Sequence, residues 1–204
     1  EHSKAHLHVD LIAGLPGESV ESFGRGFDRL VALAPHEIQF GILKRLRGAP
    51  IARHTQAHDL RFNPDPPYNI LSTDVIDFAT MQRLSRFSRY WDMVANSGRF
   101  VRTLPLLLGD APFQRFLAFS DWLYGRTGQT HAIAHERMVH AVQAFMTEEG
   151  GIGTEAANRA LIEDYRGQGG RSRLAFEDQD VARPVPVPRK KSATPPRQMR
   201  HLAG

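Results

Sequence analysis

Residues 8–19 read His-Val-Asp-Leu-Ile-Ala-Gly-Leu-Pro-Gly-Glu-Ser, and this stretch decides the fold of the amino-terminal part. Apolar and polar residues alternate from Ala5 to Leu15, which predicts a strand with one buried face and one partly polar face. The polar face carries Asp10 and suits a barrel lumen or a cleft. A Gly-Pro-Gly turn then ends the strand, and Ser19 or Glu18 can cap a following helix.

A second strand is expected one helix later, at residues 37–44. Phe23, Phe27 and Leu30 recur at helical spacing before Pro35 ends the helix. Two parallel strands joined by a helix form a right-handed βαβ unit, and α/β folds bind ligands at the carboxyl ends of such strands. Two strands are too few for a stable sheet. We therefore expect the chain, which begins at Glu1, to be a piece of a longer protein.

The remainder is expected to be mostly helical. A loop at 44–67 precedes a long helix that Ser72 or Thr73 caps and that runs to about Asn96, with further helices at 101–108, 111–124, 131–148 and 154–166. From Gly167 onward Gly, Pro and basic residues dominate, which is typical of disorder. The predicted domains are an α/β part at 1–66, an all-helical domain at 67–168 and a disordered basic tail at 169–204.

Composition narrows the classes of function. The chain has no cysteine, so it ligates no iron–sulfur cluster through thiolates and contains no disulfide or thiol nucleophile. The last 24 residues carry six basic residues and no acidic one; the rest has 20 basic and 22 acidic residues, a balance of −2. The basic character is therefore not that of a nucleic-acid-binding domain, and only weak contact by the tail is expected. No run could cross a membrane, and a cytoplasmic location is the default.

A family resemblance rests on three segments. Residues 10–19 (Asp-Leu-Ile-Ala-Gly-Leu-Pro-Gly-Glu-Ser) resemble the late-barrel motif of radical S-adenosylmethionine (SAM) enzymes that share a coproporphyrinogen-oxidase-like core. Residues 39–51 fit the next barrel strand and its loop. The Pro66-Pro67-Tyr68 loop and the Trp91 helix, which ends in Asn96-Ser97-Gly98-Arg99-Phe100, resemble a narrower group. Its members carry a cobalamin-binding domain, a radical SAM barrel and a carboxyl-terminal domain of unknown function numbered 4080.

The resemblance implies that this chain supplies the last two βα units of a partial (β/α)6 barrel and the helical domain after it. It also implies that a four-iron four-sulfur cluster and cobalamin are bound by a preceding part of the protein, that the cluster cleaves SAM to a 5′-deoxyadenosyl radical, and that methyl transfer is one reaction to expect. This chain alone would be inactive. The candidate SAM-binding residues are Asp10, Gly14, Pro16, Gly17, Glu18, Lys44 and Arg47. Glycine lets backbone approach a ligand closely, Glu18 can accept from a ribose hydroxyl or an ammonium group, and Lys44 and Arg47 can meet a carboxylate or a phosphate.

Other interpretations stay open. His6, His8 and Asp10 share a strand face and could ligate a metal, although hydrogen-bonded lumen residues are the commoner case, and no metal site is predicted. Arg83, Arg86 and Arg89 step along one helix as either a solvated face or an anionic-substrate contact. The alternative function is a non-catalytic helical interaction module with a basic tail. If the chain belongs to an enzyme, the expected partner is a small-molecule substrate of unknown identity. No membrane partner is expected.

Overall fold

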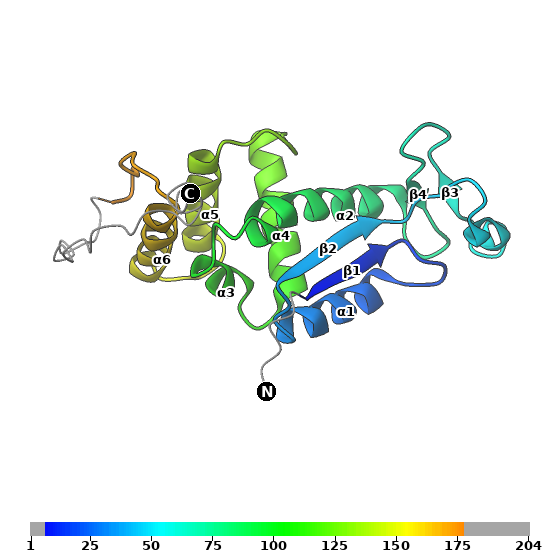
Figure 1. The fold of residues 1–204 in the computed structure, drawn as a ribbon, viewed down its shortest axis with the longest axis horizontal. Coiled ribbons are helices and arrows are strands. Elements are labelled where there is room, and N and C mark those ends of the chain that lie inside the picture. Colours follow the sequence, from blue (N-terminus) through cyan, green and yellow to red (C-terminus); the bar gives the residue numbers. More distant parts are fainter. Residues whose placement is uncertain (1–6, 178–204) are drawn as a thin grey trace, which may run out of the picture.

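A computed structural model of the protein describes residues 7–177 (Figure 1). The elements are, in order, β1 (His8–Ala13), α1 (Val20–Ala32), β2 (Glu37–Ile42), η1 (Pro50–His54), β3 (Arg61–Phe62), β4 (Ile70–Ser72), α2 (Phe78–Trp91), η2 (Asp92–Asn96), α3 (Thr103–Leu108), α4 (Pro112–Thr127), α5 (His135–Glu148) and α6 (Thr154–Gly167). Mixed α/β structure is therefore confirmed at the amino-terminal end, and helices dominate the rest. No helix within the described residues combines the length and apolar character that a membrane span requires.

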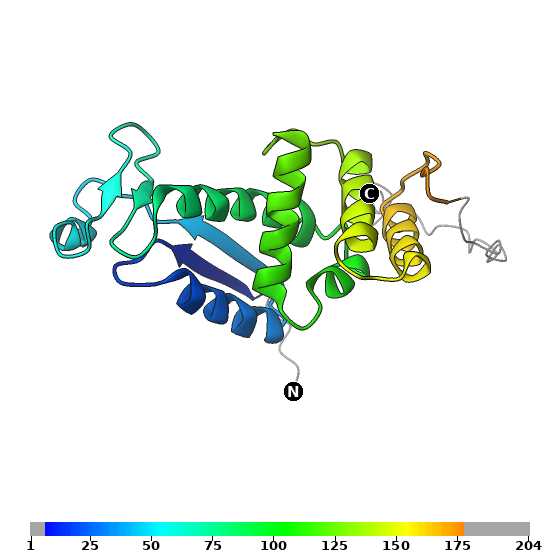
Figure 2. The same cartoon turned by 180° about the vertical axis from the view of Figure 1, so that it is seen from behind.

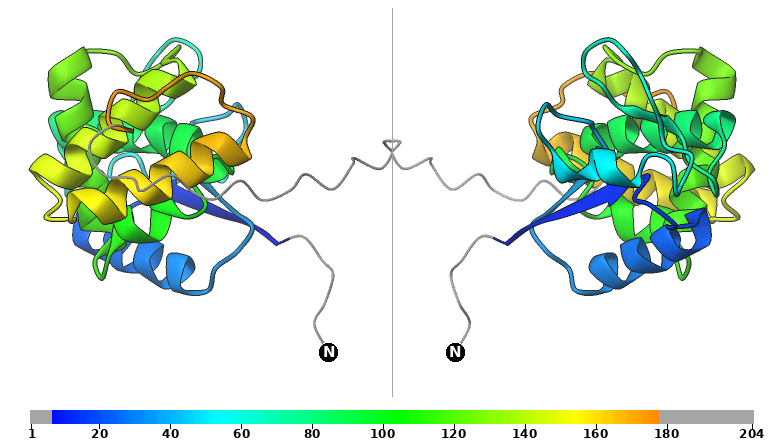
Figure 3. Two further views of the ribbon diagram at one scale, coloured as in Figure 1. Left: turned by 90° about the vertical axis from the view of Figure 1, so that its left-hand side faces the viewer. Right: turned by 90° about the vertical axis from the view of Figure 1, so that its right-hand side faces the viewer.

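The predicted βαβ unit is present. β1 and β2 pair in parallel, with Leu11 opposite Phe40, and α1 connects them. Val9, Leu11 and Ala13 lie on the side that is wholly or partly buried, whereas His8, Asp10 and Ile12 are exposed. The two-residue period therefore predicted the two faces of β1 correctly. Figure 3, which looks along the long axis of the molecule, shows α1 against one side of the strands.

α2 runs beside β2 and occupies its outer edge. The side chain of Ser88 donates to the carbonyl of Phe40 at 2.5 Å. Trp91 Nε1 and Asn96 Nδ2 both donate to the carbonyl of Ile38, each at 3.0 Å. Backbone groups at a strand edge otherwise offer a template for another strand. These three side chains satisfy carbonyls that a further strand would use, so β2 ends the sheet on this side.

Just past the ends of the two strands, the chain after β2 pairs with residues 68–70, and Ile70 lies beside Gly14. Ile70 N–H donates to the Leu43 carbonyl at 2.8 Å, and Arg45 N–H donates to the Tyr68 carbonyl at 2.9 Å. Ile70 begins β4, which pairs antiparallel with β3. Within the described residues β1 pairs with β2 alone, so the sheet can grow only beside β1. Figures 1 and 2 show β3 and β4 at the end toward which both parallel strands point.

An aromatic cluster joins the βαβ unit to the helices. Its members come from α1, β2, α2 and α4, and neighbouring ring centroids lie 4.8–6.1 Å apart. They are Phe23, Phe27, Phe40, Phe87, Trp91, Phe113 and Phe116. Rings at these separations pack edge-to-face or offset and bury large apolar areas. One hydrophobic core therefore continues across the domain boundary expected at residue 66.

Two helices take their amino-terminal caps from neighbouring helices. α4 begins with Pro112 and has no side-chain cap of its own, but Asp28 on α1 accepts from Phe113 N–H at 2.7 Å. α3 likewise lacks a local cap, and its first amides donate to Asp164 on α6. A carboxylate at a helix amino terminus satisfies orphan N–H groups and complements the helix dipole. These carboxylates therefore fix how the helices meet.

We expect Asp28→Ala to lower the free energy of unfolding by about 1–2 kcal/mol, the usual cost of losing a cap. Chemical denaturation followed by circular dichroism measures this difference. Asp110→Ala is the matched control, because Asp110 is an exposed carboxylate next to the same helix end and makes no cap contact. Equal stability of the two variants would contradict a capping role for Asp28.

Two expectations about the helical part are wrong in detail. It is not all-helical, because Ile70–Ser72 forms β4. Ser72 and Thr73 do not cap α2: the Thr73 hydroxyl accepts from Val75 and Ile76 N–H in a turn, and Asp77 caps α2 instead. Thr73 forms this turn instead of a helix cap because threonine hydroxyls readily accept hydrogen bonds from backbone N–H groups two or three residues later.

The disordered tail was predicted to begin at residue 169, which is too early, because residues 170–176 pack against the helices. Gly170 N–H donates to the Tyr165 carbonyl at 2.9 Å, and Leu174 and Phe176 are buried in the core. Asn158, fully buried on α6, donates to the carbonyl of Phe176. Two apolar side chains and one buried amide are enough to hold residues 170–176 against α6, despite their polar sequence. The rest of the predicted tail, residues 178–204, lies outside the described part of the chain, as does His6.

Candidate ligand groove

The exposed face of the parallel strands forms the floor of a groove of about 940 Å³. Its lining includes strand residues, the start of the following loop and one face of α2 and η2. The lining residues are Asp10, Ile12, Glu37, Gln39, Phe40, Gly41, Ile42, Leu43, Lys44, Leu46, Pro67, Asn69, Ser85, Ser88, Arg89, Asp92 and Asn96. A volume in this range is typical of small-molecule sites.

The contacts of α2 with β2 define the order of charges along this groove. Ser88 is level with Phe40, and Asn96 is level with Ile38, so α2 runs opposite to β2. Lys44 therefore lies at the carboxyl end of the strands. Glu37 and Asp92 lie toward the amino end. Arg89, between Ser88 and Asp92, places a second cation nearer the amino end.

Asp10 and Lys44 are the two predicted site residues that line this groove. Asp10 lies opposite Gln39 in the strand register, on the exposed face. Lys44 faces Asn69 in an isolated antiparallel bridge. Arg47 is exposed and does not line the groove. The structure therefore brings together one acidic and one basic member of the predicted set and leaves Arg47 outside.

The predicted turn follows β1, but protein side chains cover its first residue, Gly14. Gly14 is buried with φ of +91°, and a Cβ built there would lie 2.6 Å from Ile70 Cγ2 and 3.1 Å from Met81 Cε. Gly17 has φ of +73°, and its Cβ would lie 3.4 Å from His58 Cε1. The missing side chain of Gly14 makes room for β4 and α2, so the argument from close ligand approach does not hold at Gly14. Pro16 belongs to the same turn and does not line the groove.

Glu18 ends the turn, just before the α1 cap Ser19. Its backbone N–H donates to the Leu15 carbonyl at 3.2 Å. Burial raises the pKa of the Glu18 carboxyl above its usual 4.5. Glu21, in the first turn of α1, has the opposite shift: hydrogen bonds to its own backbone N–H and to Ser19 lower its pKa.

We expect Glu18→Gln to gain stability relative to the unsubstituted protein as the pH rises from 4 to 7. The native state holds the Glu18 proton more tightly than the unfolded state, so this side chain contributes stability that is fully present below the unfolded pKa and is lost as the pH rises through the raised native pKa. Urea denaturation at both pH values measures the change. Glu21→Gln is the control and should lose relative stability over the same range, because its native pKa is lowered. The same sign for both variants would contradict this account.

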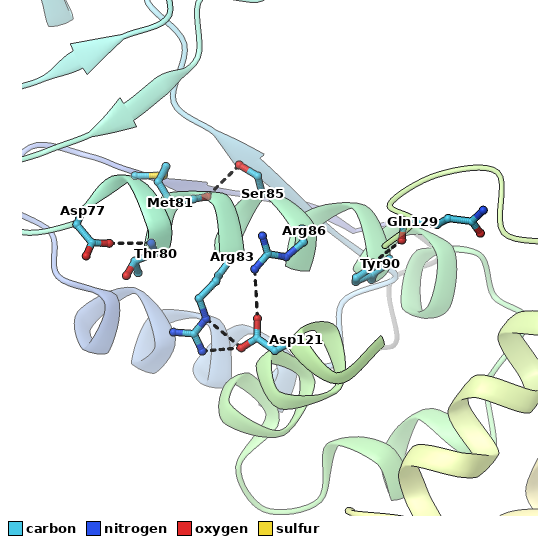
Figure 4. Close-up of polar contacts among 9 residues, drawn as sticks. All are labelled: Asp77, Thr80, Met81, Arg83, Ser85, Arg86, Tyr90, Asp121 and Gln129. Atoms are coloured by element: carbon cyan, nitrogen blue, oxygen red, sulfur yellow. Dashed lines mark hydrogen bonds and ion pairs between the residues drawn. The ribbon is translucent and has the colours of Figure 1, made fainter. Parts of the chain in front are cut away.

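The three arginines of α2 have different partners. Arg83 donates twice to Asp121 on α4, at 2.9 and 2.6 Å, and Arg86 reaches the other oxygen of Asp121 at 3.5 Å (Figure 4). Arg86 also stacks over the Tyr124 ring, 4.4 Å from its centroid. Arg89 lines the groove instead. The three arginines therefore do not share one role. Arg83 and Arg86 join α2 to α4, whereas Arg89 faces the candidate site.

Apart from Arg89, sequence reasoning missed the wall of the groove. Ser85, Ser88, Arg89, Asp92 and Asn96 come from α2 and η2, where the stripe of apolar residues drew attention to the core. Asp92–Asn96 form a π-helical turn, and Asn96 Nδ2 donates to Asp92 Oδ1 at 2.8 Å. π turns within helices are frequent at functional sites. The signal available in the sequence was the helical spacing of these polar residues, because Ser85, Ser88, Arg89 and Asp92 stand at i, i+3, i+4 and i+7.

These elements define an α/β unit that continues into a helical region, with a polar groove where the two meet. The family described as "Protein of unknown function (DUF4080)" matches residues 56–175, which is more than half of the chain. The chain belongs to this family. The match begins before the boundary expected at residue 67 and ends within the segment that packs on α6. No curated protein and no solved structure matches the chain.

Proposed function

We propose that this chain is the carboxyl-terminal part of a radical SAM enzyme, in which β1 and β2 are the last strands of a partial barrel and the groove is part of its lumen. The observation that carries the proposal is the asymmetry of the sheet. α2 occupies the outer edge of β2, whereas the part of the chain that is described leaves β1 as an edge strand. A terminal barrel strand has this arrangement, with further strands added on one side only.

The polarity of the two faces supports the same proposal. In α/β barrels helices cover the outside, and chemistry takes place on the inner side near the carboxyl ends of the strands. Here α1 packs on the apolar face through Phe23 and Phe40, whose ring centroids are 4.8 Å apart. The opposite face carries Asp10 and Gln39 and is the floor of the groove.

The residues of this chain fit only part of the cofactor set. The sequence has no cysteine, so the preceding part of the protein would hold the four-iron four-sulfur cluster, and cobalamin is likewise assigned there. Asp10 and Lys44 suit SAM, because a carboxylate and an ammonium group complement its charged methionine end and its hydroxyls. When SAM is bound at a reduced cluster, it supplies a 5′-deoxyadenosyl radical. Gly14 does not fit a direct ligand role, since Ile70 and Met81 fill the space beside it.

In this proposal the residues of the chain bind, orient and shield. Asp10 accepts hydrogen bonds from ligand donors at the floor, and Lys44 neutralises an anionic group at the carboxyl end of the strands. The side chains of α2 form the wall that faces the substrate. Methyl transfer is one reaction that this arrangement could serve. The class of substrate is inferred from the residues of the groove, because the family match carries no substrate.

The decisive experiment uses a longer protein that includes the coding sequence upstream of Glu1, expressed anaerobically with iron and sulfide. We expect a cluster in stoichiometric amount and release of 5′-deoxyadenosine from SAM under reduction. An upstream frame without a Cys-x3-Cys-x2-Cys loop, or a protein without cluster and cleavage, would reject the proposal. The alternative of a non-catalytic interaction module would then become the working hypothesis.

A variant tests the groove within that enzyme. Asp10→Asn should raise the SAM concentration for half-maximal cleavage about tenfold, as expected for loss of a charge-assisted hydrogen bond. Asp59→Asn is the control, because Asp59 pairs with Arg61 on the surface and does not line the groove. Equal SAM dependence of the two variants would exclude Asp10 from the binding site.

A further inference from the structure

Arg89 is held in place without a neutralising partner. Its Nη1 donates to the Thr130 hydroxyl at 2.9 Å, and its side chain is exposed at the wall of the groove. None of the ion pairs within residues 7–177 involves Arg89 or Lys44. By contrast, Arg83 and Arg86 share Asp121 (Figure 4).

The segment that carries Thr130 is itself fixed. The Tyr90 hydroxyl donates to the Gln129 carbonyl at 2.6 Å, as Figure 4 shows. Arg137 Nη1 donates to Gln129 Oε1 at 3.0 Å, so α5 holds the same loop. A neutral hydroxyl therefore positions the guanidinium of Arg89 and leaves its charge and most of its donors available. A cation that is held in advance pays less ordering entropy when it binds a ligand.

From this arrangement we infer that the groove binds a small organic acid, with Arg89 holding its carboxylate or phosphate. The planar donors of arginine match both anions in a two-pronged geometry. Asp92, on the same wall of the groove, accepts hydrogen bonds, so the ligand also carries hydroxyl or amine donors.

This inference deepens the proposed function, because it names the substrate class for the groove assigned there to a radical enzyme. Only the role of the bound acid as a substrate rests on the proposed function. The anion site is a property of residues that this chain contains, and neither SAM nor an iron–sulfur cluster takes part in it.

The test is a titration of the 204-residue chain at low and constant ionic strength. Gluconate serves as a hydroxylated carboxylate, glycerol 3-phosphate as a hydroxylated phosphate, and glycerol as the neutral reference. Amide chemical shifts in nitrogen–proton NMR spectra report binding and also the integrity of the fold. We expect saturable shifts with at least one of the two acids, centred on the groove, and none with glycerol. The acid that binds more tightly identifies the anionic group.

Matched variants locate the site. Arg89→Gln should weaken binding about tenfold, as expected when a charge-assisted pair is lost. Arg61→Gln removes an exposed arginine outside the groove and should leave the dissociation constant unchanged. Thr130→Val keeps the charge but removes the hydroxyl that positions it, and should weaken binding about threefold, whereas Thr130→Ser should restore it.

Two results would overturn the inference. One is the absence of saturable binding for both acids, and the other is equal affinity in Arg89→Gln and in the unsubstituted chain. The outcome is independent of the radical chemistry. Anion binding through Arg89 together with no SAM cleavage by the longer protein would reject the proposed function alone. Cleavage without anion binding would reject this inference alone.

Discussion

Asp164→Ala should lower the free energy of unfolding by about 3 kcal/mol, equivalent to roughly 10 °C in melting temperature for a protein of this size. Asp164 is only 8% exposed and accepts from three donors: Arg102 N–H, Thr103 N–H and the Thr103 hydroxyl. Thr103 is fully buried. Removing the carboxylate leaves the backbone N–H of Thr103 without a hydrogen-bond partner in the core, which costs more than the loss of the bond alone. Chemical denaturation followed by circular dichroism measures the change.

The neighbouring residue supplies the control. Glu163 pairs with Arg102 on the surface at 3.1 Å, and both side chains are about half exposed or more. Glu163→Ala should therefore cost less than about 1 kcal/mol. Arg102 N–H, Thr103 N–H and the Thr103 hydroxyl all reach Oδ2, so Asp164→Asn can keep one oxygen in that place, and we expect it to cost only about 1 kcal/mol. If Asp164→Ala and Glu163→Ala had equal stability, the capping of α3 by α6 would not matter.

Asp164 also shows where sequence reasoning reaches its limit. Local patterns predicted β1, α1 and β2, because a period of two and a period of 3.6 are written into consecutive residues. They also predicted the existence of the later helices. They could not predict that Asp28 caps α4 or that Asp164 caps α3, because 85 and 61 residues separate Asp28 from Phe113 and Asp164 from Thr103. No local signal records a contact of that kind.

The candidate site divides in the same way. Asp10 and Lys44 could be placed from their strands, because a strand face and a strand end follow from the register. The wall of the groove depends on the packing of α2 along β2, which rests on bonds such as Trp91 Nε1 to the Ile38 carbonyl. The apolar stripe of α2 predicted a buried helix but not its partner. Arg89 became distinct from Arg83 and Arg86 only when the position of Asp121 was known.

Gly14→Ala should destabilise the chain by about 3 kcal/mol or more in the absence of any ligand. Two costs combine at this position. A φ of +91° strains a residue with a side chain, by about 1–2 kcal/mol. The new methyl group would also lie 2.6 Å from Ile70 Cγ2, and Ile70 is fully buried, so the core must shift. Urea denaturation of the ligand-free protein measures the sum.

Gly48→Ala separates these two costs. Gly48 has a similar φ of +78°, but nothing lies within 4 Å of the position of its Cβ. It should therefore show the backbone cost alone, about 1–2 kcal/mol. If Gly14→Ala cost no more than Gly48→Ala, the packing of β4 and α2 on the turn would not be tight, and the room beside Gly14 would again be available to a ligand.

A double variant tests the packing directly. Ile70→Ala removes the clashing methyl group at the cost of a cavity, so Gly14→Ala/Ile70→Ala should lose at least 1 kcal/mol less than the sum of the two single variants. Additive losses would instead assign the whole effect to the backbone. The outcome decides how the motif should be read in other chains, because a glycine that serves packing is needed wherever β4 and α2 cover this turn, whether or not a ligand binds there.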